Sequence, residues 1–387
     1  MGVFMKKIFI LVISLLVLPI CTKAYEVDLA PNAKSAILIE VSTGKVIFEK
    51  NSNERYAPAS MTKMMSMLLF LEAIEKGIMT WEENITISAN ASSMGGSQIL
   101  LETGEVMSVH DLFKGVSVAS GNDATVALAE RVAGTEEAFV NKMNEKAKAL
   151  GLTNTHFVNC TGLDTEDHYS TAHDMMVIAK ELVSHEKIFE FSSIYEDYLR
   201  EGTDRKFWLV NTNKLVRFYN GADGLKTGYT DNAGYCLTAT AKRNEMRLLG
   251  VIMNEENSNI RNQEMMAMLD YGFNQYEIEK VLTVKSKVDT ITIEKAKKQE
   301  VDIIPTSDIT LLHKKTEEKS NVTFEIKLND LKPPIKKGQI IGQIVIKEDN
   351  NTSRIENLTV AEDVEKANIL NLFLRHLNNI LIGNISF

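Results

Sequence analysis

A serine and a lysine lie three residues apart at the start of an apolar stretch of the chain, YAPASMTKMMSMLL. In a helix, Ser60 and Lys63 would share one face, and the first turn would place free backbone N–H groups near Ser60, which favours an anionic nucleophile. Serines are also common at ordinary helix starts. The same spacing recurs at two other places, Ser42 with Lys45 and Ser184 with Lys187. The pair by itself is therefore weak evidence for a catalytic serine and its base.

A nucleophilic serine needs a base, and lysine is the remaining candidate in this chain. The seven histidines form no Ser/His/Asp pattern, and there is no G-x-S-x-G motif. There is also no H-E-x-x-H motif and no paired-cysteine site, so we expect no metal and no other cofactor. A free lysine has a pKa near ~10.4 and is protonated at neutral pH. Lys63 can act as a base only if burial or a neighbouring cation lowers its pKa.

Two further short motifs follow in the sequence. Ser120-Gly121-Asn122 lies at a predicted junction between a loop and a helix, and Lys226-Thr227-Gly228 lies on a predicted strand. Each motif alone is weak, because polar and glycine-rich segments of this kind are common in turns. In the order Ser-x-x-Lys, Ser-x-Asn, Lys-Thr-Gly, the three motifs are far more specific, and together they indicate one active site.

The elements that must position these motifs follow from hydrophobic patterning. Residues 36–49 predict a β-hairpin, and helical patterns dominate from about residue 60 to residue 190. The segments GLKTGYT, GYCLTATAKR and MRLLGVIM are then typical of consecutive antiparallel strands. A hairpin, a helical middle and later strands predict an α+β domain whose first and last strands share one sheet.

The chain has 387 residues, 44% of them apolar, which is enough for two domains. From about residue 283, short alternating segments such as NVTFEIKL and GQIIGQIVI predict a small all-β domain. The tail from Val364 to Ile382 predicts a helix with one apolar side. That side carries Ile369, Leu370, Phe373, Leu374, Leu377, Ile380 and Leu381. Such a helix either packs on its own domain or lies in a membrane interface, and we expect the second.

The N-terminus and the net charge indicate where the protein acts. Residues 1–24 contain Lys6 and Lys7, an apolar core and a small-residue cleavage site ending at Ala24, which is typical of a secretory signal. Cys21 is not expected to carry a lipid, because Ile20 before it is bulky. A net charge of −9 without a basic run argues against a nucleic-acid partner.

Longer segments around the three motifs carry a family resemblance. They are, in order, APASMTKMM, GGSQILLETGE, SGNDA, NTHFVNCTGLD, YSTAHDM and DGLKTGYTDNAGYCL. The chain resembles the serine D-alanyl-D-alanine carboxypeptidases, the low-molecular-mass penicillin-binding proteins, closely over residues 30–255. The resemblance implies a catalytic domain of the penicillin-binding protein and β-lactamase type at 25–277. A β-rich domain at 278–360 and an amphipathic helix at 361–387 would follow.

The resemblance implies an activity and its catalytic residues. The enzyme would remove the terminal D-alanine from peptidoglycan stem pentapeptides, in cell-wall synthesis and remodelling, through an acyl-enzyme that β-lactams also form. Ser60 would attack the carbonyl between the two D-alanines, Lys63 would take its proton, and Ser120 would relay the proton to the leaving amine. Lys226 would help to lower the pKa of Lys63. The protein would be exported to the outer face of the bacterial cytoplasmic membrane and held there by its C-terminal helix.

The remaining motif residues would hold the substrate. Asn122 would pair with a substrate amide, and Lys226 with Thr227 would bind the terminal carboxylate. Gly228 would leave room for substrate along the strand edge. The backbone N–H of Tyr229 would join that of the nucleophilic serine in an oxyanion hole.

Three other interpretations share parts of this pattern. A class A β-lactamase would need an acidic deacylating residue, for which Glu166 or Asp167 is available, although the surrounding segment resembles the carboxypeptidases better. A DD-endopeptidase is separable only by assay. An inactive wall-binding scaffold is disfavoured because all three motifs are intact.

Cys236, near the Lys-Thr-Gly motif, is expected to be a small buried residue rather than a nucleophile.

Overall fold

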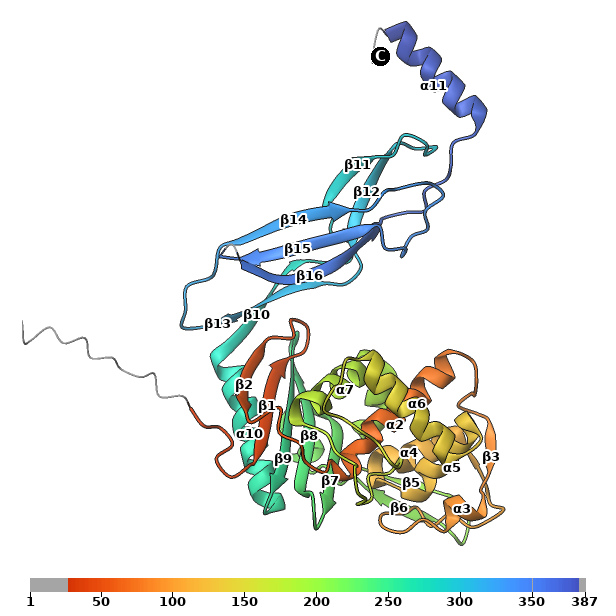
Figure 1. The fold of residues 1–387 in the computed structure, drawn as a ribbon, viewed down its shortest axis with the longest axis vertical. Coiled ribbons are helices and arrows are strands. Elements are labelled where there is room, and N and C mark those ends of the chain that lie inside the picture. The colour runs from red at the N-terminus through yellow and green to blue at the C-terminus, as the bar shows by residue number, and fades with distance from the viewer. Residues whose placement is uncertain (1–26, 350, 383–387) are drawn as a thin grey trace, which may run out of the picture.

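The protein, seen as a computed structural model, is described over residues 27–349 and 351–382. The predicted signal sequence and Cys21 lie outside these residues. Figure 1 shows a larger domain that carries all three motifs, a smaller β-rich domain beyond it, and a C-terminal helix at the far end. This is the predicted α+β architecture followed by a small all-β domain.

The larger domain is built on a five-stranded antiparallel sheet with the strand order β2-β1-β9-β8-β7. The strands are β1 (Ser35–Glu40), β2 (Val46–Lys50), β7 (Ala222–Thr230), β8 (Gly234–Arg243) and β9 (Met246–Glu255). β1 pairs with β9 over its whole length, with Leu38 opposite Gly250. The prediction that the first and last strands of the domain share one sheet is therefore confirmed.

Alternate residues of β1 point into two separate hydrophobic cores. Ile37 and Ile39 pack with the helical region, whereas Leu38 packs with α10 (Ser258–Gln275). Since side chains alternate across a strand, an apolar strand of this kind must be covered on both faces. Figure 1 shows α10 on one side of the sheet and the other helices on the opposite side.

The helical region connects β2 to β7 and surrounds α2. Its helices are α2 (Lys63–Glu75), α3 (Ala89–Ser92), α4 (Val109–Ala119), α5 (Asn122–Ala133), α6 (Glu136–Ala149), α7 (Ala172–Ser184), α8 (Phe189–Ser192) and α9 (Leu215–Phe218). Shorter elements are the 3₁₀ turns η1 (Ala59–Thr62) and η2 (Glu186–Ile188) and the strand pairs β3 (Asn84–Thr86) with β4 (Val106–Ser108) and β5 (Glu196–Leu199) with β6 (Phe207–Val210). Most residues of α2 are buried, so its first turn is held firmly in place.

The smaller domain is a twisted sheet with its own core. Its strands follow the order β11-β12-β16-β15-β14, and β10 pairs with β13 where the chain enters from α10. The strands are β10 (Tyr276–Leu282), β11 (Asp289–Thr292), β12 (Glu300–Pro305), β13 (Ile309–Lys314), β14 (Val322–Leu328), β15 (Gly342–Glu348) and β16 (Asn351–Val360). The hairpin between β1 and β2 contacts this domain, because Ser42 Oγ lies 2.7 Å from Thr310 Oγ1 and Lys45 Nζ lies 2.7 Å from Glu348.

The C-terminal helix α11 (Ile369–Ile382) begins at Ile369 rather than at Val364. Val364 is buried in the core of the β-rich domain and pairs with Ile335, so this segment cannot enter the helix. Arg375 joins α11 to that domain by donating to the backbone carbonyls of Glu294, Ala296 and Lys297, at 2.7, 2.9 and 3.1 Å.

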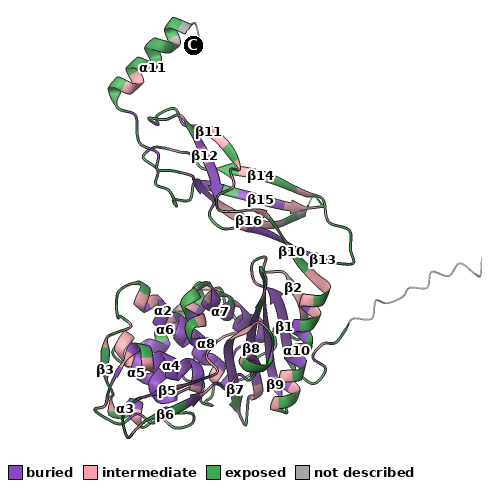
Figure 2. Ribbon diagram, turned by 180° about the vertical axis from the view of Figure 1, so that it is seen from behind, coloured by how far each residue is buried: buried purple, intermediate pink, exposed green. Residues whose placement is uncertain are grey.

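Figure 2 shows that most of α11 is exposed, and its exposed residues include those of its apolar side. Leu370, Phe373 and Leu377 are among its exposed residues, and Ile369 at the start of the helix is 87% exposed. In the part of the chain that the structure describes, no helix combines the length and the apolar character needed to cross a membrane.

Candidate active site

Ser60 and Lys63 lie at the start of α2 with their reactive atoms in contact. Ser60 belongs to η1, and Lys63 is the first residue of α2. Lys63 Nζ lies 3.0 Å from Ser60 Oγ, within hydrogen-bond distance. Ala59, before the serine, has a φ of +46°, a strained conformation for a residue other than glycine. The Ser-x-x-Lys pair is therefore a direct contact, held by a strained turn.

Lys63 is fully buried, and three oxygen atoms surround its amine. Besides Ser60 Oγ, they are Asn122 Oδ1 at 2.6 Å and the backbone carbonyl of Thr161 at 2.7 Å. None of the three is charged. Burial disfavours the ammonium form and lowers the pKa of Lys63 to about 7. A large share of Lys63 is therefore neutral near pH 7 and able to accept a proton.

Ser120 and Asn122 lie where α4 ends and α5 begins, as the sequence predicts. Ser120 has a φ of +63°, and its buried hydroxyl has no hydrogen-bond partner among the described residues. Because an unpaired buried hydroxyl costs about 1–3 kcal/mol, this group is available to a bound molecule. Asn122 Nδ2 donates to Gly95 O at 2.7 Å, so its Oδ1 faces Lys63. Both polar ends of the Asn122 amide are thus engaged within the protein.

Lys226 is buried on β7, within electrostatic range of Lys63. Burial lowers the pKa of Lys226 well below its usual value, and the charges of Lys63 and Arg261 lower it further. The sequence analysis expects Lys226 to lower the pKa of Lys63. In the structure, burial is the main cause of the lowered pKa of Lys63, and repulsion between the two buried lysines disfavours the protonated form of each. Next to it, Thr227 Oγ1 donates to Thr212 Oγ1 at 2.7 Å.

β7 runs against the turn that carries Ser60, and Gly228 permits this close approach. A Cβ atom at Gly228 would lie 2.8 Å from Pro58 O and 3.1 Å from Ala59 Cβ. Contacts this short would push the turn and the strand apart. The glycine is therefore required by the packing of β7 on η1, a reason that the motif alone does not reveal.

Tyr229 follows Gly228 and lies at the edge of the site with a side chain that is 52% exposed. Its ring packs on Tyr235 with the centroids 4.3 Å apart, and its hydroxyl donates to Asp231 at 3.0 Å. The hydrogen bond to Asp231 raises the pKa of Tyr229. The Tyr229 ring is thus held at the surface, while its backbone lies in the strand beside Ser60.

The loop of residues 158–164 is a part of the site to which sequence analysis assigns no role. Besides supplying the Thr161 carbonyl, it packs on the Ser60 turn, and a Cβ at Gly162 would overlap Ala59 O. The loop is part of the segment NTHFVNCTGLD, which carries the family resemblance. A sequence motif identifies side chains, however. It does not predict that the backbone carbonyl of Thr161 accepts a hydrogen bond from Lys63, 98 residues away.

His168 and Arg261 also have no sequence signal. His168 is buried between the Ser60 turn and this loop, with Nε2 2.8 Å from Thr62 Oγ1 and Nδ1 3.1 Å from Val158 N. Arg261 lies on α10 and acts on Lys226 through its charge. Neither residue belongs to a recognisable motif, because tertiary packing alone brings them to the site.

We expect His168 to make the stability of the protein fall as the solution becomes acidic. Burial, with a smaller repulsion from His156, lowers the pKa of His168 to about 4, and Asp164 opposes this shift. In the unfolded chain the pKa is near ~6.5. Between these values only the unfolded chain binds the proton. The contribution of neutral His168 to the free energy of unfolding is therefore complete above pH ~6.5 and is lost as the pH falls from there through about 4.

The measurement is chemical denaturation of the wild type and of His168→Gln at pH 7 and pH 4.5. The stability of the wild type relative to the variant should fall by about 2–3 kcal/mol over this range. A difference that stays constant, or that grows in acid, would contradict the assignment.

The residues that support other interpretations lie outside this arrangement. Glu166 and Asp167 are exposed, and Glu166 has no contact that would place it at Ser60 among those the structure describes. Cys236 is a buried free thiol, as predicted, and burial raises its pKa to about 11. Glu72, Glu181 and His185 form a group with the spacing of metal ligands, but the amine of Lys146 already lies 2.6 Å from Glu72 and 3.2 Å from Glu181.

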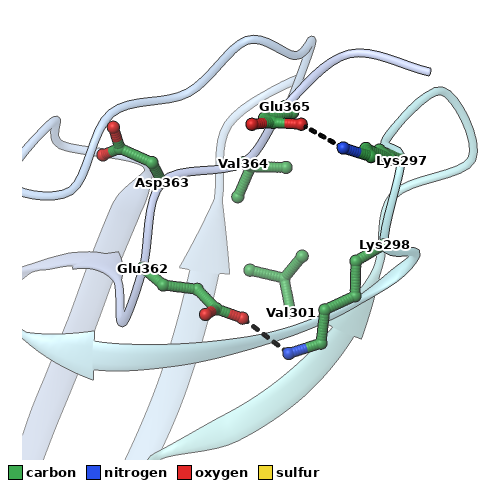
Figure 3. Close-up of a pocket in the computed structure, with 7 residues that line it drawn as sticks. All are labelled: Lys297, Lys298, Val301, Glu362, Asp363, Val364 and Glu365. Carbon is green, nitrogen blue, oxygen red and sulfur yellow. Dashed lines mark hydrogen bonds and ion pairs between the residues drawn. The ribbon is translucent and has the colours of Figure 1, made fainter. Parts of the chain in front are cut away.

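A surface hollow in the β-rich domain is shown in Figure 3. It is lined by Lys297, Lys298, Val301, Glu362, Asp363, Val364 and Glu365. Two ion pairs cross it, from Lys297 to Glu365 at 2.8 Å and from Lys298 to Glu362 at 2.5 Å. Its lysines are thus already paired, and it contains no nucleophile, so the chemistry of this chain is assigned to the Ser60 site.

Comparisons with known proteins cover nearly the whole chain. Residues 22–257 match the family described as D-alanyl-D-alanine carboxypeptidase, and residues 276–366 match the C-terminal domain of penicillin-binding protein 5. The chain is 48% identical to D-alanyl-D-alanine carboxypeptidase DacF of Bacillus subtilis, over 91% of each chain. It is 33% identical to DacC of Escherichia coli, over 87% of this chain and 85% of that protein.

Solved structures resemble the fold over most of the chain. Penicillin-binding protein 5 from Haemophilus influenzae superposes with a TM-score of 0.71 at 31% identity, covering 87% of this chain and 98% of that one. Penicillin-binding protein D2 from Listeria monocytogenes, in an ampicillin-bound form, has a TM-score of 0.57 at 30% identity, covering 62% of this chain and 98% of that one. Taken with the geometry of the Ser60 site, these matches show that the chain belongs to the D-alanyl-D-alanine carboxypeptidase family.

Proposed function

We propose that the protein is a serine-type D-alanyl-D-alanine carboxypeptidase that removes the terminal D-alanine of peptidoglycan stem pentapeptides through an acyl-enzyme at Ser60. The contact of Ser60 Oγ with the buried amine of Lys63, at 3.0 Å, carries this proposal. A serine becomes a nucleophile when a base takes its proton, and a lysine with a pKa of about 7 is suited to do so. The names of the relatives support the substrate class.

The surroundings of Lys63 explain why its lone pair would point at the nucleophile. A neutral amine has two N–H donors and one lone pair. Asn122 Oδ1 and the Thr161 carbonyl can only accept hydrogen bonds, so they take both N–H groups. The lone pair is then left facing Ser60 Oγ, which can donate its proton. These two acceptors thereby orient Lys63 as a general base.

Acylation would then proceed with a balanced transfer of one proton. Ser60 Oγ attacks the carbonyl carbon of the peptide bond between the two D-alanines, and Lys63 takes the hydroxyl proton. The Oγ–C bond forms first and gives a tetrahedral oxyanion. When this intermediate collapses, the C–N bond breaks and the proton passes from Lys63 through the unpaired hydroxyl of Ser120 to the leaving amine. The backbone N–H groups of Ser60 and Tyr229 would stabilise the oxyanion. A water molecule then hydrolyses the ester and restores the Ser60 hydroxyl.

The substrate carboxylate would be held by Lys226 and Thr227. Lys226 is buried, has no carboxylate partner in the described part of the chain, and donates to the backbone carbonyl of Thr227 at 2.9 Å. An incoming carboxylate would supply the counter-charge and would favour the protonated form of Lys226. β-Lactams carry a carboxylate and a reactive acyl carbon, so they would acylate the same serine.

Two measurements test the proposal: labelling with a fluorescent penicillin, and release of D-alanine from a pentapeptide. Ser60→Ala is the control and should not be labelled. A wild-type protein that neither labels nor releases D-alanine would overturn it. Cleavage of cross-linked dimeric peptides in preference to pentapeptides would instead identify an endopeptidase.

We also propose that the protein is exported and held at the outer face of the cytoplasmic membrane by α11. The exposed apolar side of this helix supports the proposal, since Arg375 already ties its opposite side to the β-rich domain. A helix with this distribution of residues partitions into a membrane interface.

Deleting residues 369–387 is expected to move the protein from the membrane fraction to the soluble fraction without unfolding it. The deletion starts at Ile369 because Val364 and Ala367 are buried in the β-rich domain. Replacing Phe373 and Leu377 together by serine should weaken membrane binding in the same way, whereas Asn378→Ser should not. Fractionation of cells that express each variant measures this, and unchanged membrane partition of the truncated protein would exclude α11 as the anchor.

A further inference from the structure

His168 connects two separate parts of the chain that surround Lys63. Its Nε2 lies 2.8 Å from Thr62 Oγ1, in the turn between Ser60 and Lys63. Its Nδ1 lies 3.1 Å from the backbone N of Val158, at the start of the loop 158–164. The ring is only 6% exposed, and it packs edge-on against Phe157 at a centroid distance of 5.8 Å. Among the described residues, no hydrogen bond joins His168 to Ser60 or Lys63.

These two contacts determine which nitrogen of the ring carries the proton. A backbone N–H can only donate, so Nδ1 must accept from Val158 and carries no hydrogen. The proton therefore lies on Nε2, which donates to the hydroxyl of Thr62. A doubly protonated ring could not accept from Val158, and the other neutral tautomer would place two N–H groups face to face.

The loop that His168 holds supplies one of the two acceptors that orient Lys63. Thr161 lies three residues after Val158, and its carbonyl accepts from Lys63 Nζ at 2.7 Å. If this carbonyl moved away, the neutral amine could rotate about its Cε–Nζ bond, and its lone pair would no longer be directed at Ser60. Other contacts also hold the loop, among them Ser66 Oγ to Cys160 O at 2.7 Å. Loss of the histidine should therefore loosen the loop rather than unfold it.

We infer that His168 is a positioning residue for acylation: its neutral ring, protonated on Nε2, ties the loop 158–164 to the Ser60 turn and keeps the Thr161 carbonyl against Lys63. The inference rests on the proposed role of Lys63 as the base. It assigns to a residue outside the three motifs a part in orienting the base, without any contact to substrate.

The expected consequence is a slower acylation step with unchanged binding. A displacement of about 1 Å at a reacting group can cost on the order of 10²-fold in rate. His168→Ala should therefore lower the rate constant of acylation by a fluorescent penicillin roughly 10- to 100-fold. The dissociation constant of the complex that precedes acylation should remain within about twofold, because the residues proposed to bind substrate are not changed.

The test measures acylation by stopped flow at 25 °C in full-length variants whose folding is verified by near-ultraviolet circular dichroism. His168→Gln keeps one donor and one acceptor on a planar group and should recover most of the rate. Thr62→Val removes the acceptor of the Nε2–H bond and should slow acylation as well. Since the two residues act through one contact, the double variant should be no slower than the slower single variant. His156→Ala is the control, because His156 is exposed and the hydrogen bond of its ring, within the described residues, is to the backbone carbonyl of Asp167.

Each outcome decides the inference. A rate constant in His168→Ala equal to that of the wild type would overturn it. An equal loss in His168→Gln and His168→Ala would also overturn it, because the hydrogen bonds would then not be what matters. If His168→Ala does not fold, the glutamine variant and Thr62→Val carry the test alone. A wild-type protein that is not acylated at all would refute the proposed function instead.

Discussion

The Lys63→Arg variant is expected to acylate with penicillin, and to release D-alanine, roughly 10³-fold more slowly than the wild type at pH 7. A guanidinium stays protonated up to a pH above ~12, so it cannot take the proton of Ser60 even though it keeps the positive charge. Because Lys63 is fully buried, the larger guanidinium of the variant has no room to turn toward solvent. Steady-state release of D-alanine and the acylation rate constant measure the loss.

The control for this substitution is Lys76→Arg, at the other end of α2. Lys76 is exposed and pairs with Glu72 at 2.8 Å, away from the Ser60 site, so its variant should keep the wild-type rate. If Lys63→Arg also kept that rate, another group would have to be the base.

The pH dependence of the wild type should report the same group. Below the pKa of about 7, Lys63 holds a proton and cannot accept one from Ser60. The acylation rate constant should therefore fall about tenfold for each pH unit below that value and level off above it. A profile that is flat from pH 5.5 to pH 8.5, or that falls as the pH rises through 7, would contradict the role of Lys63.

The Ser60→Ala variant is expected to form no covalent adduct with penicillin and to release D-alanine at least ~10⁴-fold more slowly. No acyl-enzyme can form there without the hydroxyl oxygen. The variant should keep its fold, because Ser60 Oγ has one hydrogen-bond partner among the residues that the structure describes, the amine of Lys63. Intact-mass spectrometry after incubation with penicillin provides the measurement.

Ser184→Ala is the matched control, since Ser184 shares the spacing to a lysine but its hydroxyl donates to Glu181 O in its own helix. It should label like the wild type. A mass increase in Ser60→Ala would show that another side chain is acylated, and peptide mapping would then test Ser120, the other hydroxyl of the site.

Local patterns were sufficient to predict much of the fold. β1, β2 and β7 to β9 lie where alternation and turn residues predict them, because side chains in a strand alternate regardless of the partner strand. The start of α11 was predicted wrongly at Val364. Helical spacing continues through that residue in the sequence, but its side chain is used by the core of the β-rich domain.

The sequence by itself determined the identity and order of the reactive side chains, because Ser-x-x-Lys, Ser-x-Asn and Lys-Thr-Gly are recognisable as short strings. Only the tertiary structure decided what makes Lys63 a base. Its acceptors come from Asn122 and Thr161, 59 and 98 residues away, and its pKa is lowered chiefly by burial. Burial, carbonyl direction and the His168 tautomer arise from contacts between distant segments, so no local pattern can encode them.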